Sequence, residues 1–253
     1  MKIGLVLSGG GVRGVAHLGV IKCLKEWNVP IHCISGTSAG ALVGAFIASN
    51  YKPEDILKIT KHIELFDWKT LSIGTLGFLK MHKIEIMLEK YLPETFEKLK
   101  IPLFVCATDI INNQYTIFNT GQLIPTLLAS SSIPILYEPV LLNNIYYVDG
   151  GVLNNLPVEP IENQCDKIIA IHVNHMLPST TNKISFKDLL EKTFHLSISQ
   201  SVYLKKDKCD IFIDIPNMSQ FSMFDIKNAD AIYDYAYQYT NQNKEHILQQ
   251  INR

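Results

Sequence analysis

The stretch Lys2-Ile-Gly-Leu-Val-Leu-Ser-Gly-Gly-Gly-Val-Arg-Gly14 runs from an apolar, partly β-branched segment directly into a glycine-rich turn. Residues 2–7 predict a buried strand, and apolar side chains at helical spacing predict a helix from Gly14 to about Trp27. A second unit follows, with a short strand over residues 31–35, a second glycine turn and an alanine-rich helix to about Ser49. Repetition of strand, glycine turn and helix is typical of a parallel sheet with crossover helices.

The remaining segments extend this pattern without a repeat or a linker. Further strands are predicted at residues 103–108, 115–118, near Tyr146, at 167–173 and at 210–215. Helices are predicted over residues 185–205 and from about Asp225, with two weaker helical patterns within residues 53–98. We therefore expect one domain over residues 1–253, of the α/β class.

Composition narrows the classes of partner. The formal net charge of −1 provides no basic surface to follow a phosphate backbone, so nucleic acid is not expected as a partner. The short basic run at Lys205, Lys206 and Lys208 is interpreted as a solvated helix end.

Cysteine usage and hydropathy predict the cellular location. The five cysteines are odd in number and widely spaced, which predicts free thiols in a reducing, cytoplasmic environment rather than disulfides or a metal site. The chain becomes glycine-rich within its first ten residues, too early for the apolar stretch of a signal peptide. It also has no apolar run of about 18 residues. Any membrane contact is therefore expected to be peripheral, at the inner face.

The second glycine turn, Gly36-Thr-Ser-Ala-Gly40, matches Gly-x-Ser-x-Gly between a strand and a helix. In this context the motif is a nucleophile elbow, a sharp turn that exposes the serine hydroxyl at a helix N-terminus. The flanking glycines, Gly36 and Gly40, let the strand and the helix pack closely. Ser38 is the predicted nucleophile of an acyl-transfer enzyme.

The first glycine turn, Gly9-Gly-Gly-Val-Arg-Gly14, has two competing interpretations. Its backbone N–H groups either form an oxyanion hole or cradle a dinucleotide pyrophosphate. The second interpretation requires an acidic residue at the end of the next strand, where Ser38 stands instead, and Glu26 lies on the preceding helix. The oxyanion hole is preferred, and no cofactor or metal is expected.

A serine nucleophile needs a base, and spacing alone leaves its identity open. His172 and His175 follow a strand end, but no acidic partner is evident near them in the sequence. Asp149, followed by Gly150 and Gly151, also ends a predicted strand, although Asp-Gly pairs are common turn formers. The sequence pattern does not decide between Asp149 and a histidine.

Taken together, these residues resemble the patatin-like phospholipase family in its compact bacterial single-domain form. The resemblance covers about residues 3–160 and rests on three ordered blocks: Gly9-Gly-Gly-Val-Arg-Gly14, Gly36-Thr-Ser-Ala-Gly40 and Asp149-Gly-Gly151. Three connecting segments support it: Cys106-Ala-Thr-Asp109, Ala129-Ser-Ser-Ser-Ile-Pro134 and Asn154-Asn-Leu-Pro157.

The resemblance implies a three-layer α/β/α fold with a mainly parallel central sheet. It also implies a catalytic dyad in which Ser38 is the nucleophile and Asp149 the general base. Further implied roles are an oxyanion hole formed by Gly9, Gly10 and Gly11, with Gly10 and Gly11 the preferred donors, and a bracing role for Arg13. Burial of Asp149 is expected to raise its pKa from the ordinary value of about 3.9, so that it abstracts the proton of the Ser38 hydroxyl more readily.

The implied substrate is a fatty-acyl ester of a phospholipid or lysophospholipid. The segment Phe66–Phe78, with its apolar side chains, is interpreted either as a lid or interfacial contact, or as ordinary core. Two alternative functions remain: an acyltransferase that uses the same acyl-enzyme, and a non-catalytic nucleotide-binding module.

Overall fold

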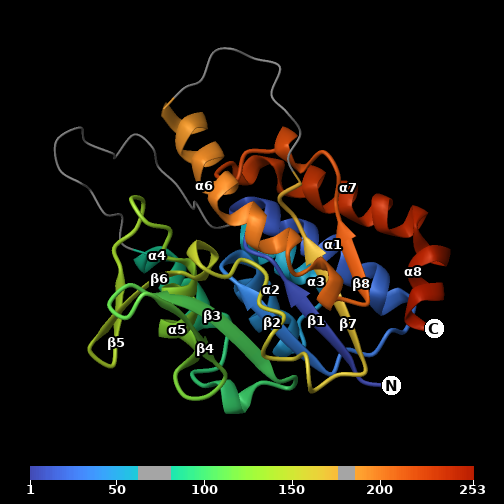
Figure 1. The fold of residues 1–253 in the computed structure, drawn as a ribbon, viewed down its shortest axis with the longest axis horizontal. Helices are drawn as coiled ribbons and strands as arrows, with labels where there is room; N and C mark the ends of the chain where they lie inside the picture. Colours follow the sequence, from blue (N-terminus) through green and yellow to red (C-terminus); the bar gives the residue numbers. More distant parts are fainter. Residues whose placement is uncertain (62–80, 176–185) are drawn as a thin grey trace.

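The computed structural model describes residues 1–61, 81–175 and 186–253, which form a mixed β-sheet surrounded by helices (Figure 1). Five strands are parallel and stand in the spatial order β3-β2-β1-β7-β8. They are β1 (Ile3–Leu7), β2 (Cys33–Thr37), β3 (Leu103–Asp109), β7 (Lys167–His172) and β8 (Ile211–Asp214). All five were predicted, and their ends lie within about two residues of the predicted ones, which is the usual uncertainty of element boundaries.

Three antiparallel strands complete the sheet around β3: β4 (Gln114–Phe118), β5 (Val140–Leu142) and β6 (Ile145–Asp149). Along β3, residues 105 and 106 pair with both β2 and β4, and residues 107–109 pair with both β4 and β6. Because a strand has only two edges, β2 and β6 must share the edge opposite β4. Thr37 pairs with Cys106 and Asp149 with Ala107, so the carboxyl ends of β2 and β6 meet head to head.

One face of the sheet packs against most of the helices (Figure 1). Side chains alternate between the two faces of a strand, and Leu5 and Leu7 point into this larger core. Its helices are α1 (Val15–Glu26), α2 (Ala39–Ala48), α3 (Pro53–Lys61), α4 (His82–Tyr91), α5 (Leu123–Ser131), α7 (Ala229–Gln242) and α8 (Lys244–Ile251).

The opposite face carries the intervening residues, such as Val6, and is covered by the segment 156–161 and by Val202 of α6 (Phe186–Tyr203). The sheet therefore lies between two covering layers, as the α/β/α prediction required. The second layer is thinner than a row of crossover helices, because an irregular segment of turns supplies much of it.

Several local details differ from the predicted pattern. Residues Gly11–Gly14 form a separate 3₁₀ turn, so α1 begins at Val15 rather than at Gly14. The predicted C-terminal helix is divided at Asn243 into α7 and α8. Helix α5 was not predicted because nearly all of its side chains are buried, which removes the one-sided apolar pattern that marks a surface helix.

The cysteines agree with the predicted free thiols. None of the five forms a disulfide, and Cys23, Cys33 and Cys106 are buried. Sγ of Cys33 and Sγ of Cys165 lie 3.0 Å apart, in hydrogen-bond contact. No helix within the described ranges is long and apolar enough to cross a membrane.

Candidate active site

Ser38 occupies the sharp turn between β2 and α2. Its backbone has φ 54° and ψ −124°, a conformation that non-glycine residues rarely adopt and that costs about 1–3 kcal/mol. A Cβ atom added to Gly36 would lie 2.7 Å from the carbonyl carbon of Gly40, so Gly36 lets β2 approach α2 this closely. A Cβ atom added to Gly40 would overlap the Leu7 carbonyl, so Gly40 lets α2 approach β1. The predicted elbow geometry is thus present, with Ser38 only 6% exposed.

A second serine holds the turn in this conformation. The backbone N–H of Ser38 donates to Oγ of Ser130 at 2.9 Å, and that hydroxyl donates to the carbonyl of Cys106 at 2.6 Å. Ser130 comes from α5 and Cys106 from β3, so the elbow is fastened to two separate elements. The sequence analysis placed Ser130 only in a connecting segment. Its role was missed because no local pattern links residues 92 positions apart.

Asp149 contacts the Ser38 hydroxyl directly. Oγ of Ser38 donates to Oδ2 of Asp149 at 2.6 Å, and the N–H of Gly151 donates to Oδ1 at 2.7 Å. The backbone of Asp149 is held on both sides, since its N–H donates to the Ser132 carbonyl and its own carbonyl accepts from Thr108 Oγ1. The aspartate is therefore oriented by its neighbours before any substrate binds.

The electrostatic environment of Asp149 is unusual for a carboxyl group. Burial raises its pKa from 3.8 to about 6, and the hydrogen bonds from Ser38 and Gly151 oppose this shift only in part. A carboxylate with this pKa is a stronger base than an exposed aspartate, yet it is still largely ionised at neutral pH. The group is therefore suited to accept the proton of the Ser38 hydroxyl.

Gly150 allows β6 to end at this position. A Cβ atom on Gly150 would overlap the backbone carbonyl of Cys106 in β3. With glycine there, the Asp149-Gly-Gly151 turn lies flat against the sheet, and its second glycine supplies the N–H that binds the Asp149 carboxylate.

The first glycine turn lies beside the nucleophile. A Cβ atom on Gly9 would be 3.1 Å from the Cβ atom of Ser38, and one on Gly14 would be 2.5 Å from that of Ala39. The Gly9 N–H donates to the Asn155 carbonyl at 3.2 Å and is already engaged. Among the described residues, no acceptor binds the N–H groups of Gly10 and Gly11. These two amides remain available for an anion.

Arg13 ties the glycine turn to the C-terminal part of the chain. The buried guanidinium donates to the Phe221 carbonyl at 2.7 Å, to Nε2 of His195 at 2.7 Å and to Oε1 of Glu191 at 2.6 Å. The same Glu191 oxygen accepts the N–H of Met223, whose carbonyl accepts the N–H of Val12. These contacts hold the glycine turn Gly9–Gly14 against the C-terminal part of the chain.

Three histidines, His17, His172 and His175, form hydrogen bonds with groups other than Ser38. His17 donates through Nε2 to the Ser8 carbonyl at 2.8 Å, and burial lowers its pKa to about 4. His172 and His175 both donate to the carboxylate of Asp214 at 2.9 Å. No acidic residue near this pair in the sequence is an evident partner, and the structure supplies one from a distance: Asp214 lies on β8, the parallel neighbour of β7.

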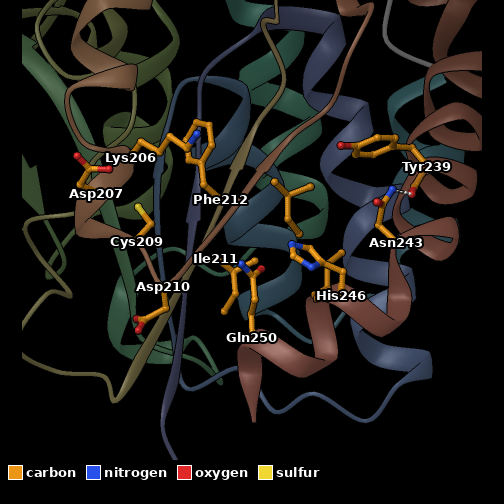
Figure 2. Close-up of a pocket in the computed structure, with 12 residues that line it drawn as sticks. Lys206, Asp207, Cys209, Asp210, Ile211, Phe212, Tyr239, Asn243, His246 and Gln250 are labelled. Atoms are coloured by element: carbon orange, nitrogen blue, oxygen red, sulfur yellow. Dashed lines mark hydrogen bonds between the residues drawn. The ribbon is translucent and has the colours of Figure 1, made fainter. Parts of the chain in front are cut away.

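A hollow of about 610 Å³ lies away from Ser38, between β8, α7 and α8. Figure 2 shows residues that line this hollow, including Phe212, Tyr239 and His246, and none of its lining residues belongs to the site. The segment Phe66–Phe78, interpreted above as a lid, lies outside the described residues.

Comparisons with known proteins identify the family to which the chain is similar. A family model described as patatin-like phospholipase matches residues 5–161. Lysophospholipase NTE1 of Cryptococcus neoformans var. neoformans serotype D is 32% identical over 183 residues, covering 68% of this chain and 11% of that protein. Lysophospholipase NTE1 of Meyerozyma guilliermondii is 30% identical over 230 residues, covering 87% of this chain and 15% of that protein.

Among solved structures, VipD from Legionella pneumophila is similar in fold. Its TM-score is 0.56 at 15% sequence identity, with 95% of this chain and 66% of that chain covered. The chain spans less than a sixth of the length of the two curated relatives it matches.

Proposed function

This chain belongs to the patatin-like phospholipase family, and from that premise we propose that it is a serine acyl-hydrolase that cleaves carboxylic esters of phospholipids or lysophospholipids. The observation that carries the proposal is the 2.6 Å hydrogen bond from Ser38 Oγ to the buried carboxylate of Asp149. The two groups form a dyad in which Asp149 takes the part that histidine has in a triad.

The reaction begins when Ser38 Oγ attacks the ester carbonyl and transfers its proton to Asp149. The N–H groups of Gly10 and Gly11 stabilise the oxyanion of the tetrahedral intermediate, at the positive end of the turn and helix that follow. Asp149 then returns the proton to the departing alcohol, which leaves an acyl group on Ser38. Water, activated by the same carboxylate, attacks this ester and releases the fatty acid.

The substrate class rests on the relatives. Two of them carry the name lysophospholipase at 30–32% identity, and the family model matches residues 5–161, which include the Ser38 and Asp149 blocks. The nucleotide-binding alternative has less support, because the Gly9 amide already binds the Asn155 carbonyl and Glu26 binds the Tyr237 hydroxyl. The glycine turn therefore has fewer free N–H groups to bind a pyrophosphate, and no free carboxylate stands at the strand end to bind the ribose.

The test compares wild type with Ser38→Ala and Asp149→Asn in lysophospholipid hydrolysis and in labelling by a fluorophosphonate probe. Both variants are expected to lose at least about 10³-fold in kcat/KM, since the members of such a unit act together. Labelling is expected to disappear entirely in Ser38→Ala, because the probe bonds to that oxygen.

Ser131→Ala is the matched control. Ser131 is a buried neighbouring serine whose Oγ has no hydrogen-bond partner among the described residues, and its loss is expected to leave the rate within about threefold. Substantial hydrolysis by Ser38→Ala, or loss of activity in Ser131→Ala at unchanged folding, would contradict the dyad. Release of acyl-acceptor product instead of fatty acid, when an alcohol is added, would favour the acyltransferase.

A further inference from the structure

An apolar cavity adjoins the two glycine turns that form the site. Its lining begins at Gly11 of the glycine turn and at Ala39, the residue after Ser38, and extends between α2 and the helices α1, α3 and α4. Among the described lining residues, Thr60 alone has a polar side chain. A cavity of this composition has no partner for a charged or hydrogen-bonding group and favours a hydrocarbon.

Helix geometry gives the cavity its direction. Ala39, Leu42, Val43 and Phe46 all line it, and their spacing of three, four and seven residues places them on one face of α2. At 1.5 Å per residue, this face extends about 10 Å from the nucleophile. When an acyl group is bonded to Ser38 and its carbonyl oxygen binds the Gly10 and Gly11 amides, the hydrocarbon chain of that group can extend along α2.

The far end of the cavity is closed. Phe46 is 3% exposed and Ile56 of α3 is 1% exposed, whereas Leu42 and Met87 are only half-buried. We infer from this difference that the mouth of the cavity lies beside Leu42 and Met87. The cavity measures about 80 Å³. That is less than the ~150 Å³ of a cavity known to bind benzene, so only a short length of hydrocarbon fits without movement of side chains.

We propose that this cavity binds the first carbons of the substrate's acyl chain, and that Leu42 at its mouth determines which acyl chain lengths are accepted. The proposal rests on the proposed function, because it takes Ser38 as the atom to which the acyl group is bonded. A competing hollow of about 570 Å³ also borders α4, and its lining includes Met81, Glu138 and Val140. Its carboxylate-bearing wall is less suited to a hydrocarbon chain.

The test measures kcat/KM for p-nitrophenyl esters from acetate to palmitate with reciprocal changes at Leu42. Leu42→Trp is expected to retain acetate hydrolysis within about threefold, since chemistry at Ser38 is untouched, but to lose at least tenfold on octanoate. Leu42→Ala is expected to shift the preferred ester toward longer chains. Val140→Trp adds the same bulk to the competing hollow and is expected to leave the chain-length profile unchanged.

A second readout does not depend on catalysis. Titration of decanoate into Ser38→Ala is expected to show binding that weakens at least tenfold when Leu42→Trp is added and is unchanged when Val140→Trp is added. If wild type hydrolyses no ester but Leu42→Trp still weakens decanoate binding, the proposed function fails and the cavity assignment stands.

Two results would overturn the cavity assignment. One is that Leu42→Trp lowers acetate and octanoate hydrolysis equally. The other is that Val140→Trp alone alters the chain-length profile or the affinity for decanoate.

Discussion

Asp149 shows how burial adapts an ordinary side chain to catalysis. Its carboxylate is desolvated, and within the described part of the chain it accepts two hydrogen bonds, one of them from the nucleophile itself. The ionised form is therefore less stable than it would be in water, and its affinity for a proton is correspondingly higher. Two measurable consequences follow, one for the rate and one for stability.

The rate is expected to depend on pH through Asp149. With its pKa raised to about 6, kcat/KM should increase with pH and reach half of its plateau near that value. His172→Ala is the control and should keep the same midpoint, because that imidazole binds Asp214 rather than Ser38. A midpoint below about pH 4.5, as for an exposed aspartate, would show that Asp149 is not the titrating base.

The same shift predicts a gain in stability on neutralisation. The folded-state pKa of about 6 exceeds the unfolded value of 3.8, so the folded protein retains the proton more strongly between these values. The stabilisation is complete below about pH 4 and is lost as pH rises through 6, which leaves a cost of about 3 kcal/mol at pH 8.

Asp149→Asn should therefore be more stable than wild type at pH 8 by up to about 3 kcal/mol, and nearly equal to it at pH 4. Urea unfolding at both pH values measures the difference. A variant less stable than wild type at pH 8 would indicate that the carboxylate stabilises the fold, contrary to the direction of its pKa shift. The variant is expected to be more stable but less active than wild type, a trade-off that is common at catalytic positions.

At the scale of elements, the glycine turn depends on contacts that come from far along the chain. Arg13 and Glu191 form a buried ion pair whose side chains are 4% and 11% exposed. The pair connects the turn to α6 and, through Met223, to the segment that accepts the Val12 N–H. The orientation of the Gly10 and Gly11 amides is thus set partly by residues beyond position 161, where the family match ends.

Glu191→Ala should accordingly destabilise the protein by about 3–5 kcal/mol, because it leaves the Arg13 charge buried without its carboxylate. A fall in kcat/KM is also expected from a loosened turn. The control is Glu94→Ala, which removes an exposed partner of Lys98 and should change the free energy of unfolding by less than about 1 kcal/mol. Equal losses in the two variants, measured by urea unfolding, would contradict the bracing role.

At the scale of the whole molecule, α1 and α7 pack unusually closely. A Cβ atom on Gly19 would lie 2.5 Å from the Tyr233 carbonyl and 2.7 Å from the Tyr237 amide nitrogen, so the two helices meet at a glycine. Because α1 follows the glycine turn and α7 belongs to the C-terminal part, this contact joins the two halves of the chain (Figure 1).

Gly19→Val should therefore destabilise the fold by at least about 1–3 kcal/mol, the usual cost of overpacking. Lys25→Ala on the exposed side of the same helix serves as the control, with an expected change within about 0.5 kcal/mol. Thermal or urea unfolding distinguishes them. An unchanged Gly19→Val variant would show that α7 moves away from α1 without cost.

The sequence alone determined the features that depend on neighbouring residues. The strand, glycine turn and helix around Gly9–Gly14 and Ser38 were predictable because backbone freedom and apolar spacing act within a few residues. The same locality explains the failures: α5 is buried on nearly every side and shows no period, and the carboxylate partner of His172 lies 42 residues away.

Only the tertiary structure decided which side chain meets Ser38. Sequence spacing left Asp149 and the histidines as alternatives, since 111 residues separate Ser38 from Asp149. Pairing of β2 and β6 along one edge of β3 brings the two strand ends together, while β8 draws His172 and His175 to Asp214. Strand pairing is a property of the assembled sheet, so this contact, and the burial that raises the Asp149 pKa, exist only once the chain has folded.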